Sequence, residues 1–167
     1  HEHRAARRHR VARAYLRGDG SYQPTPFPAI ATGWMGGDFM NGNYFVDTTF
    51  PKGNDFADWL MNVGASTTWA QIFLYEVKNP ATGLNTNGRR WLYDSAGVPY
   101  FTANAPVGYP ADQQCGRLVH TGIHVANSAD DRNGPFPSAC LVQPLSAQEK
   151  ALEFLFFDLG SCLQSDS

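Results

Sequence analysis

Apolar residues spaced three and four positions apart predict two helices in this chain. In the first, Asn54 can cap the start and Gly64 can end the helix in the left-handed conformation. The second begins at Ser146, which forms a capping box with Glu149, and ends at Gly160. Each helix has an apolar stripe that we expect to face a core: Phe56, Trp59, Leu60 and Val63 in the first, and Leu152, Leu155, Phe156 and Leu159, widened by Phe154 and Phe157, in the second.

Shorter runs rich in β-branched and aromatic residues predict the strands. These runs are 44–46, 69–77, 90–93, 98–102 and 117–125. The run at 69–77 is apolar over most of its length and predicts a buried strand. Residues 94–97 are expected to join the two strands beside them as a hairpin. Asn79-Pro80 and Asn87-Gly88 are turn dipeptides and predict a loop between them.

Helices and strands in this order predict one α/β or α+β domain. We expect a mixed sheet flanked by the two helices in three layers. The domain is expected at 30–163, after a basic tail and proline-rich linker at 1–29 and before a short tail at 164–167. A chain of 167 residues is long enough to bury a core of its own.

Charge is unevenly distributed along the chain. The first 20 residues contain six arginines and two acidic residues, whereas the whole chain has a net charge of −2. The tail is expected to be a solvated extension or a leader, because the body has no basic stripe that could continue a nucleic-acid interface. No apolar run approaches the roughly eighteen residues that a membrane span needs. The sequence therefore predicts no nucleic-acid partner and no membrane span.

Three cysteines, Cys115, Cys140 and Cys162, lie in the last third of the chain. They lack the C-x-x-C spacing of zinc ribbons and thioredoxin-type redox pairs. We expect one disulfide, Cys115–Cys140, which would close a loop of roughly 25 residues and stabilise the fold by about 3 to 4 kcal/mol. The alternatives are Cys140–Cys162, Cys115–Cys162 and three free thiols. A disulfide favours an extracytoplasmic or secreted location.

The strongest candidate site is the predicted strand at 117–125. Strand alternation places His120 and His124 on one face, roughly 13 Å apart at about 3.3 Å per residue, which is too far for both to bind one metal ion. His124 is expected at the carboxyl end of the strand, where open α/β sheets carry their chemistry. A neutral imidazole there can accept a proton near neutral pH, so His124 is the candidate general base. The alternative is a histidine satisfied by a backbone carbonyl, and His120 is expected to be structural.

The loop after this strand offers oxygen ligands for a cation. Asp130, Asp131 and Asn133 precede Gly134, which permits a sharp turn. Calcium binds carboxylate and amide oxygens of this kind, although the glutamate that ends a twelve-residue calcium loop is absent. We therefore expect either a divalent-cation site, with calcium as the first choice, or an ordinary solvated turn.

Several segments, which together cover most of Gly36 to Cys162, carry a resemblance to known proteins. Gly-Arg-Leu-Val-His-Thr-Gly-Ile-His-Val at 116–125 and Leu-Ser-Ala-Gln-Glu-Lys-Ala-Leu-Glu-Phe-Leu-Phe-Phe-Asp-Leu at 145–159 resemble the carboxyl end of bacterial secreted or surface proteins of no established activity. The strand followed by a histidine is also similar to glutamine-amidotransferase-like domains of flavodoxin-like fold. That likeness implies His124 as the catalytic histidine of an incomplete domain. Val125-Ala126 stand where that family has proline and glutamate, and its cysteine turn is absent.

Two functions follow as expectations. The first is a small hydrolase that attacks an ester, lactone or amide carbonyl of a small-molecule substrate with water activated by His124. Asp130 or Asp131 would hold a divalent ion or orient the imidazole, and Ser66 is a candidate nucleophile, although it lies outside a G-x-S-x-G turn. The second is a non-catalytic module that binds a surface glycan or a protein partner through aromatic residues such as Trp34, Tyr44 and Trp91.

Overall fold

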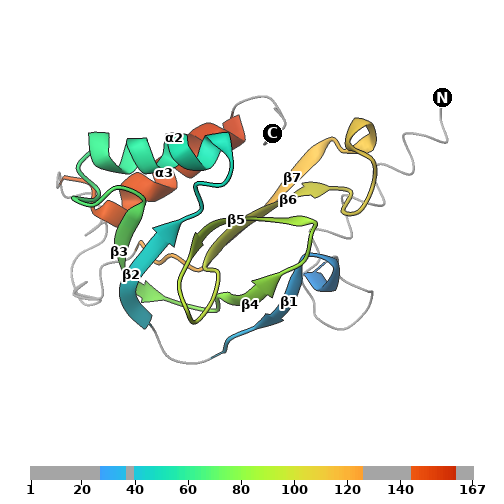
Figure 1. Ribbon diagram of the computed structural model, residues 1–167, viewed down its shortest axis with the longest axis horizontal. Helices are drawn as coiled ribbons and strands as arrows, with labels where there is room; N and C mark the ends of the chain where they lie inside the picture. The colour runs from blue at the N-terminus through green and yellow to red at the C-terminus, as the bar shows by residue number, and fades with distance from the viewer. Residues whose placement is uncertain (1–26, 37–39, 126–143, 161–167) are drawn as a thin grey trace, which may run out of the picture.

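The computed structural model of this protein describes residues 27–36, 40–125 and 144–160, which form a mixed α+β fold (Figure 1). The strands are β1 Ala31–Trp34, β2 Met40–Val46, β3 Gln71–Val77, β4 Ala81–Leu84, β5 Gly88–Tyr93, β6 Tyr100–Ala105 and β7 Gly116–Thr121. The α-helices are α2 Pro51–Asn62 and α3 Ala147–Gly160, and the 3-10 helices are η1 Phe27–Ala29 and η2 Ala111–Gln113. The prediction of a domain that combines helices and sheet is confirmed at this level.

Five strands form one curled antiparallel sheet in the order β3-β2-β5-β6-β7. The strands β1 and β4 form a separate antiparallel pair. The predicted mixed sheet is therefore wrong for the described strands, all of whose pairings are antiparallel. The reason lies in the connections, because β5, β6 and β7 follow one another through segments too short for the crossover that parallel neighbours need.

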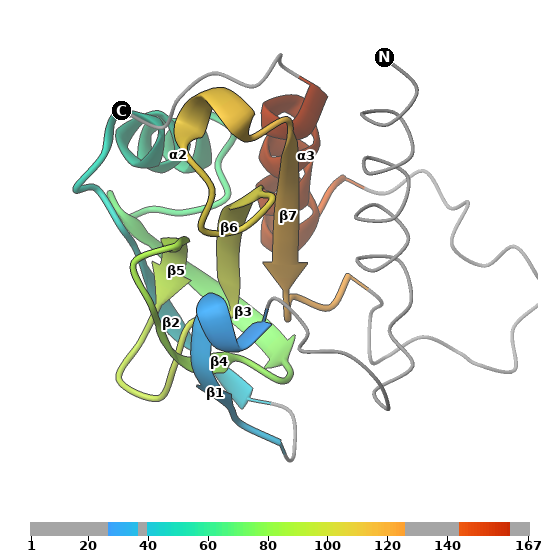
Figure 2. The ribbon, with the colours of Figure 1, turned by 90° about the vertical axis from the view of Figure 1, so that its right-hand side faces the viewer.

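The two helices lie side by side on one face of the five-stranded sheet (Figure 1, Figure 2). The β1–β4 pair packs against the opposite face, over part of β5 and β6. Among the described elements no helix covers that second face, so the flavodoxin-like arrangement with helices on both sides is not what these residues form. The part of the second face over β2 and β3 lies beside the β1–β4 pair and carries exposed side chains.

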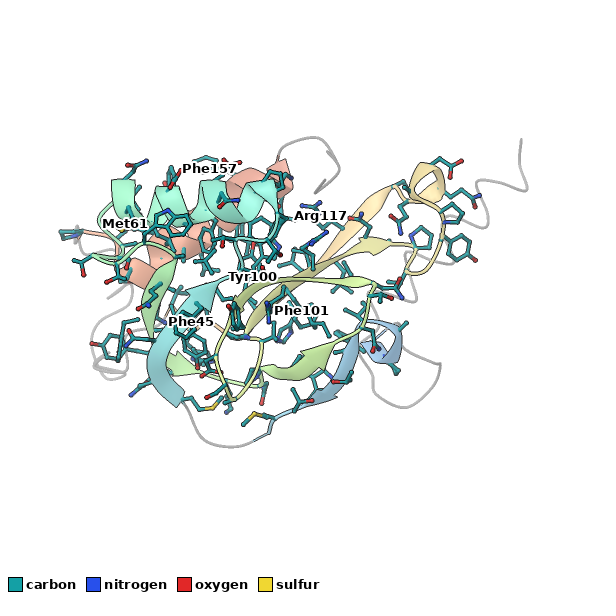
Figure 3. All side chains as sticks on the ribbon, viewed as in Figure 1. Phe45, Met61, Tyr100, Phe101, Arg117 and Phe157 are labelled. Atoms are coloured by element: carbon teal, nitrogen blue, oxygen red, sulfur yellow. The ribbon has the colours of Figure 1, made fainter. Side chains whose placement is uncertain are left out.

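Each face of the sheet has its own core. On the helix side, Trp91 stacks on Tyr100 with ring centroids 5.3 Å apart, and Phe56 packs on Phe154 at 4.9 Å. On the other side, Phe101 belongs to the smaller cluster beneath the β1–β4 pair. Tyr100 and Phe101, neighbours on β6 and both labelled in Figure 3, belong to different cores. The middle of the sheet is thus buried on both faces, which explains the full burial of β6 at its start.

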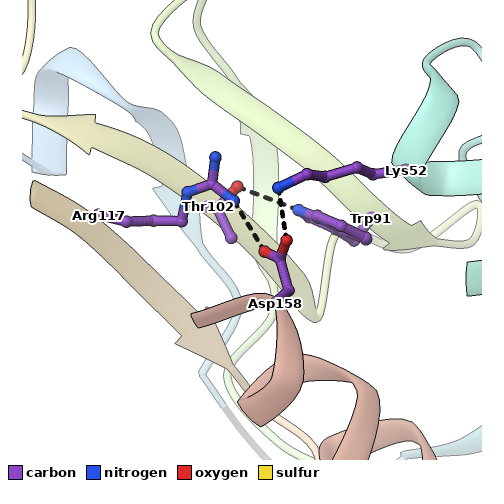
Figure 4. A network of polar contacts seen from close by, with 5 residues as sticks. All are labelled: Lys52, Trp91, Thr102, Arg117 and Asp158. Atoms are coloured by element: carbon purple, nitrogen blue, oxygen red, sulfur yellow. Dashed lines mark hydrogen bonds and ion pairs between the residues drawn. The ribbon is translucent and has the colours of Figure 1, made fainter. Parts of the chain in front are cut away.

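A buried ion network fixes α3 to the sheet and to α2 (Figure 4). Asp158 accepts hydrogen bonds from Lys52 Nζ at 2.6 Å and from Arg117 Nη1 at 2.7 Å. The side chains of Asp158 and Arg117 are only 4% and 5% exposed. Nearby, Trp91 Nε1 donates to Thr102 Oγ1 at 3.0 Å. Because a buried charge without its partner is costly, this network fixes the position of α3.

The two edges of the curled sheet meet near the start of α3. Lys78 N donates to Gly122 O at 2.9 Å, and Gly122 has no room for a side chain because a Cβ would lie 2.2 Å from Lys78 O. The buried Gln148 side chain accepts from Tyr75 N at 2.9 Å and donates to the carbonyls of Tyr75 and His124. A side-chain amide thus replaces a strand partner at this edge, which closes the sheet as a half-barrel.

The first helix was predicted with the right end and the wrong start. Gly64 has φ +65°, as expected of a glycine that ends a helix. The helix begins at Pro51, however, with Phe50 as its N-cap, because proline is favoured in the first turn. Asn54 lies inside the helix, and its side chain donates to the carbonyls of Thr48 and Phe50.

The second helix has the predicted cap but a different buried face. Ser146 N donates to Glu149 Oε2 at 2.7 Å and Glu149 N donates to Ser146 Oγ at 3.2 Å, so the capping box is confirmed. The buried residues of this helix are Gln148, Ala151 and Leu155, together with the side chain of Asp158, while Leu152 and Phe154 are partly buried against the same core. Phe156 and Leu159 of the predicted stripe are exposed. Two polar residues on the buried face obscured the correct phase of the helix.

Most of the strand predictions are confirmed, with two corrections. The hairpin of β5 and β6 is present as expected, but β4 lies in the segment predicted to be a loop. The strand β3 is half-buried, because its residues alternate between the core and solvent. This alternation exposes Phe73 and Tyr75, which the apolar composition of the run had suggested were buried.

Candidate functional site

His124 lies in an extended segment just beyond β7. The strand ends at Thr121, so strand alternation does not carry as far as His124. The residue is half-buried, and its carbonyl accepts a hydrogen bond from Gln148 Nε2. Because the sheet is antiparallel, the argument from the carboxyl ends of parallel strands no longer supports this position as a site. The role of His124 as a general base stays a prediction.

His120 is part of an aromatic cluster. Its ring stacks on Phe101 with centroids 4.9 Å apart, and the edge contact with Trp34 is 4.7 Å. Its Nε2 lies 3.2 Å from the carbonyl oxygen of Asn79. Burial lowers the pKa of His120 below its usual 6.5, and the hydrogen bond with Asn79 opposes this only in part. His120 joins β7 to β1 and to the turn before β4.

The predicted cation ligands Asp130, Asp131 and Asn133 lie outside the described residues. The calcium site therefore stays a prediction, as does any contact of Asp130 with His124. Among the residues that the structure describes, no group of three or more histidine, cysteine or acidic residues could hold a metal ion. Cys115 is exposed and its thiol is free, while Cys140 and Cys162 lie outside the described ranges, so the disulfide also stays a prediction.

Ser66 is placed in the turn after α2. Its hydroxyl donates to Thr68 O at 2.9 Å and accepts from Thr68 N at 3.1 Å. These bonds close a local turn of the kind that serine often forms. The Ser66 hydroxyl is bonded within this turn and not to His124, so the described residues do not bring the two together as nucleophile and base.

The aromatic residues proposed for partner binding are divided by the fold. Tyr44 and Trp91 belong to the helix-side core and are fully buried, so they cannot contact a partner. Burial, together with the nearby Asp94 carboxylate, raises the pKa of the Tyr44 hydroxyl to about 12. Trp34 is half-exposed, with its ring against Phe27 and His120. Only Trp34 of these three is accessible.

A different set of aromatic side chains lies on the outer surface of β2, β3 and β5. Phe45 on β2 is 42% exposed, and Phe73 and Tyr75 on β3 are 42% and 59% exposed. Phe73 contacts Tyr75 with centroids 4.8 Å apart, and Phe45 contacts Tyr93 of β5 at 5.8 Å. Figure 3 shows Phe45 on the side of β2 away from the helices. We call these four residues the aromatic face.

Strand register places these rings on one surface. Phe45 lies opposite Gln71 on β3 and opposite Tyr93 on β5, and Asn43 lies opposite Phe73. Directly paired residues of antiparallel strands share a face. The amide side chains of Asn43 and Gln71 therefore stand between the rings and make no hydrogen bond with the described residues. The surface combines rings with polar amide groups across three neighbouring strands.

The aromatic face continues into a pocket between β4 and β5. We call it the β4–β5 pocket; its volume is about 450 Å³, and the residues that line it include Asp47, Thr82, Asn85, Arg90, Tyr93 and Asp94. Tyr93 belongs to both the aromatic face and the pocket. Small-molecule sites usually occupy about 300 to 1,000 Å³, so the pocket is large enough for a ligand.

Hydrogen bonds hold the charged groups of the pocket in place. Asp47 Oδ2 accepts from Arg90 Nε at 2.9 Å, and Oδ1 accepts from Thr49 Oγ1 at 2.7 Å and from Thr49 N at 3.1 Å. Burial opposes ionisation of Asp47, but the bonds from Thr49 and Arg90 outweigh it and hold the pKa of this carboxyl below its usual value. The Arg90 guanidinium lies 3.7 Å from the centroid of Tyr93. The Asp47–Arg90 pair is preformed before any ligand binds.

Asp94 and Gly97, which also line the pocket, are held in place by local contacts. Asp94 Oδ1 accepts from the backbone N–H groups of Ala96 and Gly97, each at 2.8 Å. Gly97 packs so closely that a Cβ would lie 2.6 Å from Ala81 O. The second carboxylate oxygen of Asp94 makes no hydrogen bond with the described residues, so it remains available as an acceptor.

Comparisons with known proteins give no independent guide to the site. No protein-family model matches the sequence, and neither a curated protein nor a solved structure matches the chain. Within the described ranges, no helix has the length and apolar character needed to cross a bilayer. The functional argument therefore rests on the aromatic face and on the pocket beside it.

Sequence reasoning missed the aromatic face and the pocket for different reasons. The exposed rings Phe73 and Tyr75 stand two positions apart in a run whose other members are also apolar. Strand periodicity of two was the available signal, because it separates Ile72 and Leu74 from Phe73 and Tyr75. Asp47 is 43 positions from Arg90 in the sequence, and only the pairing of β2 with β5 brings these two residues together.

Proposed function

We propose that this chain is a glycan-binding module and that the aromatic face is its binding surface. The observation that carries the proposal is the row of Phe45, Phe73, Tyr75 and Tyr93 across three neighbouring strands, on the side away from the helices. Contiguous exposed apolar surface of this kind marks interaction sites. The proposal corresponds to the second function expected from the sequence, with a different set of aromatic residues.

The chemistry of the surface fits a sugar chain. The C–H groups on one face of a sugar ring carry partial positive charge and pack against the negative face of an aromatic ring. Between the rings, the amide groups of Asn43 and Gln71 offer donors and acceptors for sugar hydroxyls. Tyrosine adds a polar group at the rim of the same ring that stacks.

The distribution of charge disfavours a nucleic-acid partner. Nucleic-acid binding depends on lysine and arginine side chains that neutralise phosphates. Arg90, whose guanidinium lies 3.7 Å from the centroid of Tyr93, is already paired with Asp47 at 2.9 Å. A ligand of the cell surface is also what the sequence-based expectation of a secreted or surface protein would imply.

The test is retention of the chain by insoluble polysaccharides, together with a glycan array. Tyr75→Ala removes a ring that is 59% exposed on the aromatic face, and Tyr109→Ala removes one that is 56% exposed in the β6–β7 connection. We expect wild type and Tyr109→Ala to bind the same glycans, and Tyr75→Ala to lose about two- to tenfold in affinity, because an aromatic contact contributes about 0.5 to 1.5 kcal/mol. Equal binding by both variants, or a blank array, would contradict the proposal.

A second proposal retains the hydrolase with His124 as its general base. The observation that favours it is the Gln148 side chain, which bonds the main chains of both Tyr75 and His124. His124 therefore lies beside the strand that carries the aromatic face. Asp130 or Asp131, with calcium as the first choice of ion, would assist the imidazole as predicted from the sequence.

The hydrolase proposal is tested with acetylated glycans, model esters and acyl lactones, with and without a chelator. General-base catalysis is worth about 10²- to 10⁴-fold, so His124→Ala should lower the rate by that factor. His120→Ala is the control, because His120 lies in a different cluster on β7. Identical rates for wild type and His124→Ala on every substrate would end this proposal and leave the glycan-binding proposal unaffected.

A further inference from the structure

We infer that the β4–β5 pocket is a specificity subsite that takes one neutral sugar ring and holds a pair of neighbouring hydroxyl groups between Arg90 and Asp94. This inference rests on the proposed glycan-binding function and names the chemistry of its ligand. Three independent features support it: the continuity of the pocket with the aromatic face, its hydrogen-bonding groups and its charge.

The pocket begins where the aromatic face ends. Tyr93 lines the pocket and its ring contacts Phe45 on the aromatic face at 5.8 Å. A chain of sugar units that stacks along Phe73 and Phe45 is therefore led toward Tyr93. The Arg90 guanidinium lies 3.7 Å from the centroid of the Tyr93 ring and also lines the pocket, so Tyr93 and Arg90 link the aromatic face to the charged groups of the pocket.

The pocket offers both donors and acceptors in fixed positions. Arg90 uses only Nε for its bond to Asp47, and its two Nη groups make no hydrogen bond with the described residues. Asp94 uses Oδ1 for the turn at Ala96 and Gly97 and keeps Oδ2 as an acceptor. A hydroxyl group both accepts and donates, so one sugar hydroxyl can accept from Arg90 while its neighbour donates to Asp94. Groups fixed before binding lose little entropy when the ligand arrives.

The charge of the pocket selects against acidic sugars. Two carboxylates, Asp47 and Asp94, and one guanidinium, Arg90, belong to its lining. Arg90 is neutralised by Asp47 at 2.9 Å, which leaves the charge of Asp94 unmatched by the lining residues. A uronic acid would bring a second negative charge toward Asp94, and like charges repel. The ammonium group of an amino sugar would be attracted to Asp94, but it offers no acceptor for the N–H groups of Arg90.

The experiment uses methyl hexopyranosides as probes and follows the backbone amides and the Arg90 side chain by NMR. We expect the methyl glycoside of glucose, galactose or mannose to shift the amides of residues 94–98 and the Arg90 Nε–H. The methyl glycoside of glucuronic acid should bind at least about tenfold more weakly than its neutral counterpart, because repulsion offsets the hydrogen bonds. Tighter binding of the glucuronide would overturn the inference.

Two conservative variants test the assigned groups. Asp94→Asn keeps the Oδ1 acceptor of the turn and replaces Oδ2 by an amide donor, so hexoside affinity should fall about tenfold or more, which is the usual effect of losing a hydrogen bond to a charged group. Arg90→Lys keeps the positive charge beside Asp47 but loses the forked donors, with the same expected fall. The matched controls are Asp112→Asn in η2 and Arg89→Lys, whose guanidinium lies over Phe50.

The outcomes separate this inference from the proposed function. Hexoside binding that is unchanged in Asp94→Asn and Arg90→Lys, or confined to amides of β2 and β3, overturns the subsite and leaves the aromatic face as a binding surface. Hexoside binding in the pocket with no retention on any polysaccharide supports the subsite and rejects the extended surface. If no hexoside shifts any pocket amide at concentrations up to the solubility limit of the hexoside, the subsite is rejected.

Discussion

The two faces of strand β2 are both aromatic, yet they have opposite roles. Tyr44 points into the helix-side core and is 1% exposed, whereas its neighbour Phe45 is 42% exposed on the other face. The same division separates the buried Ile72 and Leu74 of β3 from Phe73 and Tyr75. The inner rings stabilise the fold, and we propose that the outer rings bind a ligand. What covers a ring, rather than how many rings a strand contains, determines its role.

The largest expected effect is the difference in the free energy of unfolding between a variant of the inner face of the sheet and a variant of the outer face. Trp91→Ala on the inner face should lower the free energy of unfolding by about 3 to 5 kcal/mol, because it leaves a cavity among Phe50, Phe56 and Tyr100. Phe73→Ala on the outer face should change it by no more than about 0.5 kcal/mol. Chemical denaturation measures both values. A loss above about 2 kcal/mol in Phe73→Ala would show that the outer ring is structural.

A similar comparison applies to the two ion networks. Asp158→Ala should cost about 3 to 5 kcal/mol, because Lys52 and Arg117 would lose the buried carboxylate that they share. Asp47→Ala should cost about 1 to 2 kcal/mol, because Arg90 is 39% exposed and water can replace the lost bond. Chemical denaturation of the two variants shows which one loses more free energy of unfolding. A reversed order would mean that α3 is not fixed by Asp158.

The imidazole ring of His120, which joins the β1–β4 pair to the sheet, should make the stability of the fold depend on pH. The pKa of folded His120 is below the usual 6.5, so the unfolded chain takes up the proton first as the pH falls. Stability should therefore be complete above pH 6.5 and decline as the pH drops through the folded pKa. The contacts of His120 are Trp34, Phe101 and the Asn79 carbonyl.

Denaturation between pH 7.5 and about pH 5, where acidic side chains stay ionised, measures this effect. His120→Gln has no titrating ring and should show a flatter profile than wild type over that range. Because His124 is present in both proteins, the difference between the profiles belongs to His120. Parallel profiles would reject the assignment.

The smallest expected effect lies at the edge of the aromatic face. Gln71→Ala should weaken glycan binding by a few-fold, because it removes one neutral amide that bonds a sugar hydroxyl at about 0.5 to 1.5 kcal/mol. Gln113→Ala, an exposed amide in η2, is the control. Polysaccharide retention at several protein concentrations resolves the two. An unchanged Gln71→Ala would restrict the interaction to the rings.

Local rules predicted the elements whose cause is local. The capping box of Ser146 and Glu149 and the left-handed Gly64 depend on residues within one turn, and both were predicted. The buried face of α3 depends on distant partners, because Gln148 bonds Tyr75 and Asp158 bonds Arg117. Periodicity of apolar residues cannot detect a buried face that contains two polar residues.

The candidate site could be predicted only in its residue types. An aromatic binding surface was expected, but Tyr44 and Trp91 are buried because the helices cover the face of the sheet on which they lie. The pocket depends on the antiparallel pairing of β2 with β5, which joins Asp47 to Arg90 across 43 positions of sequence. Pairings between distant strands follow from the whole fold, and no local pattern specifies them.

Hydroxyl-radical footprinting of the chain, with and without the polysaccharide that retains it, tests the central claim most directly. Bound glycan should reduce oxidation of Phe45, Phe73 and Tyr75 and leave two other exposed rings, Tyr109 in the β6–β7 connection and Phe156 on α3, unchanged. Protection confined to α3 or to the β6–β7 connection would contradict the account. So would full oxidation of all three rings in a sample that is fully bound.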